Sequence, residues 1–278
     1  MSNISLQNVN VFYPSPAVKT RPLGAEKPLA DFPGLNSGVC SRVFDGETQV
    51  LKNVHLEFKN HNTTAVVGPS GSGKSTLLQL INGLVKPNSG LVTVFGKAIN
   101  YNQLPALRKQ IGYAVQGTWL FPHMTIRENI TLLAKLEQWS AEKIEKRLNE
   151  LVDLVELWPH LLDRYPYQLS GGQQQRVGLC RAMMLNPEIL LLDETFGALD
   201  PITKHEIHEE FLRVQRVTDR TVLLVTHDVQ EAMKLAKRLI VLHEGKILQH
   251  DDVEVVLKKP ANAFVEQLLS SQLERVSL

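Results

Sequence analysis

The sequence predicts an α/β protein, with a largely parallel sheet at its centre, an antiparallel β subdomain before it and a helical subdomain inserted into it. Three observations predict this class. A glycine-rich segment at residues 68–76 stands between a short apolar run, 64–67, and an apolar helical stretch. The continuous apolar run 189–192 and the similar segment 221–225 are typical of parallel strands buried on both faces. Residues 124–158 have apolar side chains at steps of three or four, the spacing of amphipathic helices.

Composition and charge limit the class of protein. The chain has 278 residues, enough for one large domain or for a domain with an inserted lobe. Hydrophobic residues at 43% and charged residues at 21% are typical of soluble globular proteins, and the net charge of +1 does not indicate a nucleic-acid partner. Cys40 and Cys180 indicate no disulfide framework, so we expect a reducing compartment. We expect no membrane span, because no apolar run approaches about 18 residues. We expect no signal peptide, because the first five residues lack a basic and then apolar segment.

The first part of the chain predicts two strands separated by a long insertion. Residues 4–12 and 50–58 both alternate apolar and polar side chains, so we expect them to pair as a hairpin. Residues 14–40 contain five prolines and three glycines, which exclude a regular helix or sheet ladder. We therefore predict a proline-rich loop insertion between the two strands.

The remaining elements follow from apolar spacing and turn residues. The first half of the predicted core contains helix 77–84, strand 90–95, short helix 104–109 and strand 111–115. The second half contains helix 171–185 with Ser170 as its cap, strand 189–192, helix 202–217, strand 221–225, helix 229–236 and a hairpin of 239–242 with 246–248. The amphipathic tail 263–273 has Phe264, Leu268 and Leu269 on one face, and we expect it to pack on its own domain.

The glycine-rich segment fits the phosphate-binding loop G-x-x-x-x-G-K-[ST]. Its residues are Gly68, Pro69, Ser70, Gly71, Ser72, Gly73, Lys74, Ser75 and Thr76. Glycines let successive backbone N–H groups point into one concavity that suits phosphate oxygens, and the following helix adds its positive dipole end. We expect Lys74 to reach the β- and γ-phosphates and Ser75 to ligate Mg²⁺. An ordinary glycine-rich turn is disfavoured, because strand, spacing, lysine and serine are all present.

A second motif distinguishes among the classes of protein that carry such a loop, which include kinases, GTPases, helicases and transport ATPases. The stretch Leu169-Ser-Gly-Gly-Gln-Gln-Gln-Arg176 resembles the LSGGQ signature of the ATP-binding cassette (ABC) family. Other motifs follow in the family's order, from Val50 to about Phe264. The resemblance implies a P-loop NTPase core, with residues 1–116 as the β subdomain and first half of the core. Residues 117–168 would form the helical subdomain, 169–250 the second half of the core and 251–278 a helical tail.

The resemblance implies roles for two carboxylates that end the apolar run 189–192. A carboxylate at the carboxyl end of a strand faces the crevice where open α/β sheets bind ligands. We expect Asp193 to hold Mg²⁺, and Glu194 to orient and polarise the attacking water as general base. The alternative is that the pair caps a helix. Thr195 stands where the family commonly has proline, and we expect it at most to loosen the positioning of Glu194.

Further site residues are implied only by the order of the motifs. Gln116 resembles the glutamine that contacts Mg²⁺ and water, and His227 resembles the switch histidine that binds the γ-phosphate. Asp200 resembles the aspartate that crosses between two subunits. For the aromatic residue that stacks on adenine, Phe44 has the family's spacing before Leu51. Phe12 and Tyr13 are the competing candidates.

The signature motif implies a dimer. Ser170, Gly171, Gly172 and Gln173 open a helix, whose N-terminus is a natural anion site. In the family this end meets the γ-phosphate of ATP held by a second subunit, so two chains enclose two ATPs. We therefore expect a homodimer or a paired ATPase subunit.

One cassette without a membrane span resembles the separate ATPase subunit of a bacterial importer at the cytoplasmic face of the inner membrane. Residues 117–129 resemble the region that docks on permease subunits, and we expect exposed Trp119, Leu120 and Phe121 to anchor there. Burial of these residues in the helical lobe is the alternative. A solute-binding protein would take part only indirectly.

Three local segments, 120–125, 162–166 and 196–203, look similar to ATPases of osmoprotectant importers, which carry glycine betaine, carnitine or choline. The alternatives are another importer ATPase, for amino acids or other small solutes, and a non-transport member of the family. A P-loop kinase or a regulatory ATP-binding module is disfavoured by the signature motif and by Glu194.

Overall fold

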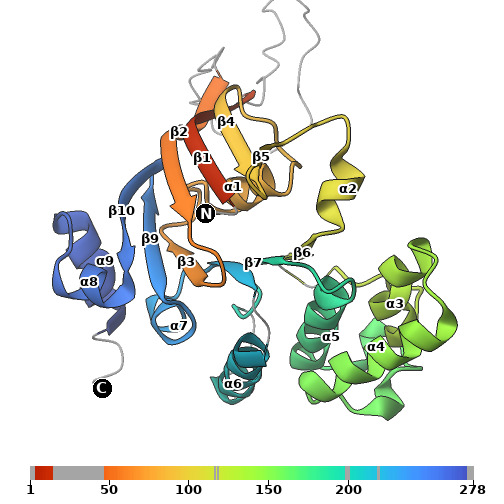
Figure 1. Cartoon of the computed structure of the whole chain (residues 1–278). Helices are drawn as coiled ribbons and strands as arrows, with labels where there is room; N and C mark the ends of the chain where they lie inside the picture. Colours follow the sequence, from red (N-terminus) through yellow and green to blue (C-terminus); the bar gives the residue numbers. More distant parts are fainter. Residues whose placement is uncertain are drawn as a thin grey trace, which may run out of the picture.

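The computed structural model describes residues 4–14, 47–115, 117, 119–197, 201–217 and 220–273. Its elements form two sheets and a lobe of helices to one side of them (Figure 1). Within these ranges no helix combines the length and the apolar character that crossing a membrane requires. Most of the predicted proline-rich insertion lies outside the described residues.

The first sheet is antiparallel and has the strand order β2-β1-β4-β5. Its strands are β1 (Ile4–Pro14), β2 (Glu47–Phe58), β4 (Ser89–Val94) and β5 (Lys97–Ala98). The predicted hairpin is confirmed, because Ile4 pairs with Phe58 and Leu6 with Leu56. These four side chains are buried and their sequence neighbours on β2 are exposed, which explains the alternation.

The second sheet contains the predicted apolar strands and has the order β10-β9-β3-β8-β7-β6. Its strands are β3 (Thr63–Val67), β6 (Ile111–Ala114), β7 (Ile189–Asp193), β8 (Thr221–Val225), β9 (Arg238–His243) and β10 (Lys246–Asp252). Every residue of β3, β7 and β8 is buried, because the pairing is parallel and both faces are covered. Only β10 runs antiparallel, against β9.

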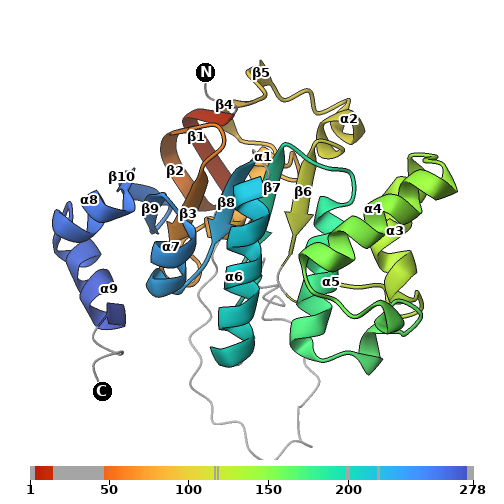
Figure 2. The ribbon, with the colours of Figure 1, turned by 60° about the horizontal axis from the view of Figure 1, so that its bottom comes forward.

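Helices cover both faces of the second sheet (Figures 1 and 2). They are α1 (Lys74–Ile81), α2 (Leu104–Arg108), α5 (Gly171–Met183), α6 (Pro201–Val217), α7 (Val229–Leu235), α8 (Val253–Lys258) and α9 (Ala263–Leu273). Helix α1 lies between the two sheets, where Leu77, Leu78 and Leu80 are fully buried. Apolar spacing did not give the bounds of α8, which lies within the helical tail that the resemblance implies for residues 251–278.

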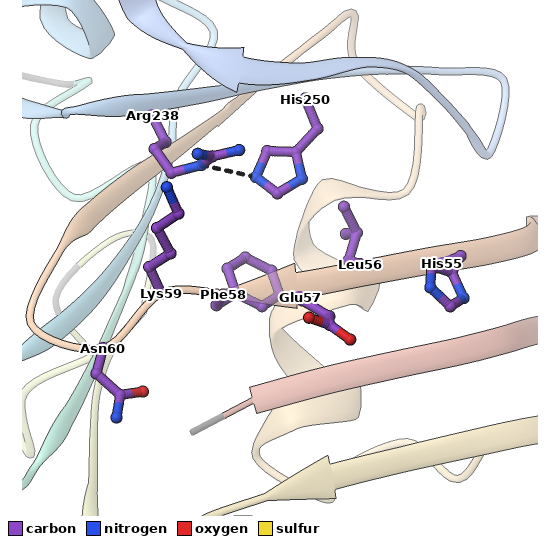
Figure 3. Close-up of a pocket in the computed structure, with 8 residues that line it drawn as sticks. All are labelled: His55, Leu56, Glu57, Phe58, Lys59, Asn60, Arg238 and His250. Carbon is purple, nitrogen blue, oxygen red and sulfur yellow. Dashed lines mark hydrogen bonds between the residues drawn. The ribbon is translucent and has the colours of Figure 1, made fainter. Parts of the chain in front are cut away.

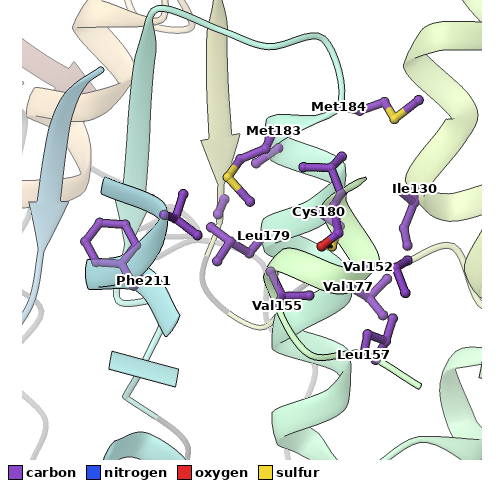
Figure 4. Packing of buried hydrophobic residues seen from close by; sticks show 14 of the residues in the cluster. Ile130, Val152, Val155, Leu157, Val177, Leu179, Cys180, Met183, Met184 and Phe211 are labelled. Atoms are coloured by element: carbon purple, nitrogen blue, oxygen red, sulfur yellow. Dashed lines mark hydrogen bonds between the residues drawn. The ribbon is translucent and has the colours of Figure 1, made fainter. Parts of the chain in front are cut away.

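The lobe contains α3 (Ile126–Leu136) and α4 (Ala141–Leu154), followed by the short 3₁₀ turns Pro159–Leu161 and Pro166–Gln168. Helix α3 begins in a capping box, in which the side chain of Thr125 accepts from the N–H of Glu128. Helix α5 packs on α3 and α4 and also contacts β6 and α6. Figure 4 shows Cys180 and Met183 of α5 between the lobe and Phe211 of α6, so one apolar cluster joins the lobe to the core.

The C-terminal helix packs on its own domain, as predicted. Val265 and Leu269 of α9 are buried in a cluster with Val241 of β9 and Val253 of α8. Gln272 accepts a hydrogen bond from the N–H of Val229 through its Oε1 atom, at 2.7 Å. This contact attaches the tail to the segment that follows β8.

Replacing the buried ring that joins α6 to the apolar cluster tests this packing. Phe211 is fully buried and meets Phe196 edge-on at 5.9 Å between ring centroids. We expect Phe211→Ala to lower the free energy of unfolding by about 3–5 kcal/mol, because it leaves a cavity. Denaturant unfolding measures this, with exposed Leu136→Ala as the control that changes it by less than about 0.5 kcal/mol. Equal effects of the two substitutions would contradict the assignment of the cluster.

Candidate functional site

The glycine-rich loop joins β3 to α1, and its shape depends on two glycines with close neighbours. Gly68 and Gly73 have φ of 157° and 103°. A Cβ on Gly68 would lie 2.0 Å from the carbonyl oxygen of Leu242, and one on Gly73 would lie 3.0 Å from that of Val50. Neither position has room for a side chain, so strands β9 and β2 confine the loop on two sides.

Lys74 extends its ammonium group into the concavity of this loop. Its Nζ atom donates to the carbonyl oxygens of Gly68 and Pro69, both at 2.9 Å. Burial lowers the pKa of Lys74, although the nearby carboxylates of Glu194 and Asp193 act in the opposite direction. The structure thus places a cation where the backbone N–H groups of α1 begin, as predicted for a phosphate site.

The carboxylate of Asp193 ends β7 directly beside the start of α1. The Ser75 hydroxyl donates to Asp193 Oδ1 at 2.9 Å, and the Tyr113 hydroxyl donates to Asp193 Oδ2 at 3.2 Å. Burial raises the pKa of Asp193, and the hydrogen bonds from Ser75 and Tyr113 partly offset the rise. A hydroxyl and a carboxylate that converge in this way are the oxygen ligands that Mg²⁺ prefers, so Ser75 and Asp193 fit that ion.

Sequence reasoning did not identify Tyr113. It lies on β6, paired with Leu191 of β7, and Asp193 is two residues further along β7. Side chains two residues apart on a strand share a face, so Tyr113 and Asp193 are on the same side of the sheet. The sequence shows a tyrosine three residues before Gln116. Its contact with Asp193 could be inferred only once β6 was known to pair with β7.

Glu194 turns out of β7 in a left-handed backbone conformation, with φ of 45°. Its N–H donates to the carbonyl oxygen of Val225 at 2.9 Å, and its Oε2 atom lies 3.4 Å from Nδ1 of His227. The two predicted catalytic side chains are therefore neighbours, at the ends of adjacent strands. Positive φ in a non-glycine residue costs about 1–3 kcal/mol, and such strain concentrates at functional sites.

Thr195, which replaces the family's usual proline, is buried at 5% exposure. Within the described residues its hydroxyl has no hydrogen-bond partner. The effect of this threonine on the positioning of Glu194 stays a prediction.

Lys74, Ser75 and Glu194 lie at the wall of a cavity of about 400 Å³. It is lined by Tyr13, Val50, Ser70, Gly71, Gly73, Lys74, Ser75, Thr76 and Glu194. Among the aromatic candidates, Tyr13 lines the cavity and Phe12 does not, whereas Phe44 lies outside the described residues. Gln116 and Asp200 also lie outside them.

The signature segment forms the start of α5. The Ser170 hydroxyl accepts from the N–H of Gln173 at 3.3 Å, and Gln173 Oε1 accepts from the N–H of Ser170 at 3.0 Å. Ser170 and Gly171 are exposed, and a Cβ on Gly171 would meet nothing within 4 Å. No described residue of α5 lines the cavity at the glycine-rich loop. The structure therefore confirms the helix N-terminus but does not bring it to the loop of the same chain.

The predicted docking segment presents two of its three apolar side chains. Trp119 is 74% exposed and Phe121 is 41% exposed. The expectation that Leu120 is exposed is wrong, because Leu120 packs against the apolar cluster of the lobe. Trp119 and Phe121 line a cavity of about 380 Å³ together with Leu133 and Arg181. Arg181 donates to the carbonyl oxygen of Trp119 at 2.9 Å, which holds the segment in place.

Comparisons with known proteins show which proteins this chain is similar to. A family model described as ABC transporter matches residues 51–197. The chain is 44% identical over 232 residues to the glycine betaine/carnitine/choline transport ATP-binding protein OpuCA of Bacillus subtilis, covering 84% of this chain and 61% of that protein. It is 42% identical over 227 residues to the glycine betaine uptake system ATP-binding protein YehX of Escherichia coli, covering 82% of this chain and 73% of that protein.

The chain thus spans about three fifths of the length of OpuCA. Among solved structures, it is similar to the ATP-binding cassette MJ0796 in a dimeric post-hydrolysis state bound to ADP and Pi. The TM-score is 0.73 at 30% identity, and the match covers 90% of this chain and 98% of that chain.

Filling the space at Gly68 tests the geometry of the loop. We expect Gly68→Ala to abolish binding of a fluorescent ATP analogue, because the methyl group would collide with the Leu242 carbonyl and displace the loop. Gly96→Ala is the matched control: Gly96 also has a positive φ, of 71°, but a Cβ there meets nothing within 4 Å. The geometry would be contradicted if the two variants bound the analogue equally well.

Proposed function

The chain belongs to the ABC transporter family, and on that basis we propose that it is the ATP-hydrolysing subunit of an importer for a small quaternary-amine solute. The observation that carries the proposal is the convergence of Lys74, Ser75, Asp193 and Glu194 at one loop. The similarity to OpuCA, a glycine betaine/carnitine/choline transport ATP-binding protein, and to YehX, a glycine betaine uptake system ATP-binding protein, supports the class of solute.

In the proposed reaction the loop N–H groups and Lys74 bind the phosphates of ATP, and Tyr13 stacks on the adenine at the mouth of the cavity. Lys74 would exchange its two carbonyl contacts for phosphate oxygens. Ser75, Asp193 and the predicted ligand Gln116 would hold Mg²⁺, which when bound neutralises charge on the β- and γ-phosphates. Glu194 orients the attacking water and withdraws its proton, while His227, 3.4 Å away, contacts the γ-phosphate.

A second subunit would complete the site. The N-terminus of α5 would meet the γ-phosphate held by the partner, and Asp200 would cross between the subunits. The residues of this N-terminus are exposed Ser170 and Gly171, followed by buried Gly172 and half-buried Gln173. The dimeric state of MJ0796 supports this arrangement. The pair is a homodimer or includes a second, related ATPase subunit. Hydrolysis removes the γ-phosphate that joins the two subunits, so the pair opens and closes with turnover.

The segment 117–129 would couple this motion to permease subunits. Trp119 and Phe121 offer exposed apolar area beside a concave surface, which is the form of an anchor site for a partner helix. The subunit would thus lie peripherally at the cytoplasmic face of the cell membrane, and contact the solute-binding protein only through the permeases. Nucleic acid has no part in this proposal.

Trapping the pre-hydrolysis state tests the two-subunit site. We expect Glu194→Gln to bind ATP without turning it over and to shift from monomer to dimer on size exclusion with ATP and Mg²⁺. The amide keeps the shape of the carboxylate but cannot accept the water's proton. Adding Ser170→Arg to this variant is the matched control, which we expect to restore the monomer while sparing ATP binding. A Glu194→Gln protein that stays monomeric with ATP bound would contradict the arrangement.

Removing the apolar anchors tests the docking surface. We expect the Trp119→Ser, Phe121→Ser double variant to lose co-purification with the permease subunits, because the partner helix loses its apolar contacts. Trp158→Ser, at a tryptophan that is 65% exposed elsewhere on the lobe, is the control and should retain the permeases. Recovery of ribosomes or DNA in place of permeases by the unaltered chain would contradict the importer assignment.

A further inference from the structure

A separate pocket, of about 500 Å³, lies between α4 and the segment that follows α5. It is lined by Trp139, Lys143, Lys146, Arg147, Glu150, Leu185 and Asn186. Each of the four charged residues of α4 that line the pocket is three or four positions from another of them or adjacent to it, so they lie on one side of the helix. None of these residues lines the cavity at the glycine-rich loop.

A buried arginine behind this pocket has no counter-ion among the residues that the structure describes. Arg220 is 5% exposed, and its Nη2 atom donates to Oδ1 of Asn186 at 2.6 Å. Within the described part of the chain it makes no ion pair with a carboxylate, and its Nη1 atom has no hydrogen-bond partner. Burial, and then the nearby Arg147, lower the pKa of Arg220 to about 10. Two arginines are thus close enough to repel, in a place where an uncompensated charge is costly.

Only one acidic side chain lines this pocket. Nη1 of Arg147 donates to Oε2 of Glu150 at 3.0 Å, and Nη2 donates to the Met183 carbonyl oxygen at 3.1 Å. Glu150 is the one carboxylate among the lining residues, against Lys143, Lys146 and Arg147, with Arg220 behind them. The positive charge is therefore undercompensated, and an anion in the pocket would offset it.

Another cavity, of about 660 Å³, also has basic residues in its wall (Figure 3). In that cavity the positive charges are nearly balanced by negative charges. There Arg238 donates to Oδ1 of Asp252 at 3.3 Å and to Nε2 of His250 at 3.2 Å. Burial lowers the pKa of His250 to about 4, so this imidazole is neutral and accepts the bond. Glu57 and Lys59 also line this cavity. The two acidic side chains, Glu57 and Asp252, nearly balance Lys59 and Arg238, so this cavity supplies a control site.

We propose that the pocket of α4 binds a small oxyanion with two or more negative charges, of the phosphate or pyrophosphate class, through Lys143, Lys146 and Arg147. Its volume lies in the range of small-molecule sites. Arg220 acts on the anion through its charge and not by contact, because its unpaired nitrogen is inaccessible. The site is independent of ATP turnover and of transport, so its failure would leave the proposed function unaffected.

A local reporter can detect the anion. The chain has three tryptophans, and Lys143 Nζ lies 3.6 Å from the centroid of the Trp139 ring. In a Lys74→Ala, Trp119→Phe, Trp158→Phe background, fluorescence comes from Trp139 alone and phosphate binding at the glycine-rich loop is weakened. Titration with sodium pyrophosphate at constant ionic strength should give a saturable change. No saturation, or an equal response to sodium chloride, would overturn the proposal.

Charge variants of both signs make the test specific. In this background we expect Lys143→Met, Lys146→Met to weaken pyrophosphate binding by about tenfold or more, and Glu150→Gln to tighten it. Lys59→Ala, in the charge-balanced cavity, should leave it unchanged. Equal binding by the lysine variant and the background protein would overturn the proposal, as would a response to phosphatidylglycerol vesicles but not to pyrophosphate.

Arg220 provides a readout that does not depend on fluorescence. We expect Arg220→Met to keep or raise the melting temperature without anion, because it removes an uncompensated buried charge. The same substitution should reduce the rise in melting temperature that pyrophosphate causes in the Lys74→Ala protein. A lower melting temperature with an undiminished pyrophosphate effect would show that Arg220 is only structural, and would overturn its part in the site.

Discussion

Parallel pairing of β3, β8 and β7 is the constraint on which the candidate site depends. Val66 pairs with Val225, and Val225 pairs with Asp193, so three segments distant in sequence end at the same level of the sheet. The glycine-rich loop, Glu194 and His227 each follow directly from one of these ends. A shift of one strand by one residue would turn Asp193 to the opposite face and separate it from Ser75. The apolar content of the three strands therefore fixes the chemistry as well as the core.

The turn between β9 and β10 holds the glycine-rich loop in place. The sequence predicted this turn as part of a hairpin, but not its contact with the loop. The N–H of Gly245, in the turn between β9 and β10, donates to the Ser72 carbonyl oxygen at 3.1 Å. The N–H of Lys52 on β2 donates in turn to the Gly245 carbonyl oxygen at 2.8 Å. The loop is thus attached to both sheets, which preorganises its backbone for a ligand at no cost at the moment of binding.

Sequence patterns predicted the elements with periodic apolar residues and the polar residues that directly follow a strand. Alternation in 4–12 and 50–58 predicted the hairpin across the long insertion. The loop spacing predicted that Lys74 extends into the glycine-rich loop, where it donates to the Gly68 carbonyl oxygen. The patterns did not predict Tyr113 on Asp193, because that bond joins two strands whose order sequence cannot show. The prediction that Leu120 is exposed was wrong for a related reason. Its partial burial depends on an apolar cluster whose members are distant in sequence. Phe44, Gln116 and Asp200 stay predictions from resemblance.

Helix α5 connects the exposed signature segment at its N-terminus to the buried core of the molecule. Its exposed start carries Ser170, while its later turns are buried among the lobe and the core. Between these, Arg176 donates to Glu210 of α6 at 2.7 Å, and Glu210 is only 2% exposed. Burial raises the pKa of Glu210 to about 7, and its pairing with Arg176 opposes that rise. Removing either partner of this buried ion pair would leave an uncompensated charge, so Arg176 and Glu210 attach α5 to α6.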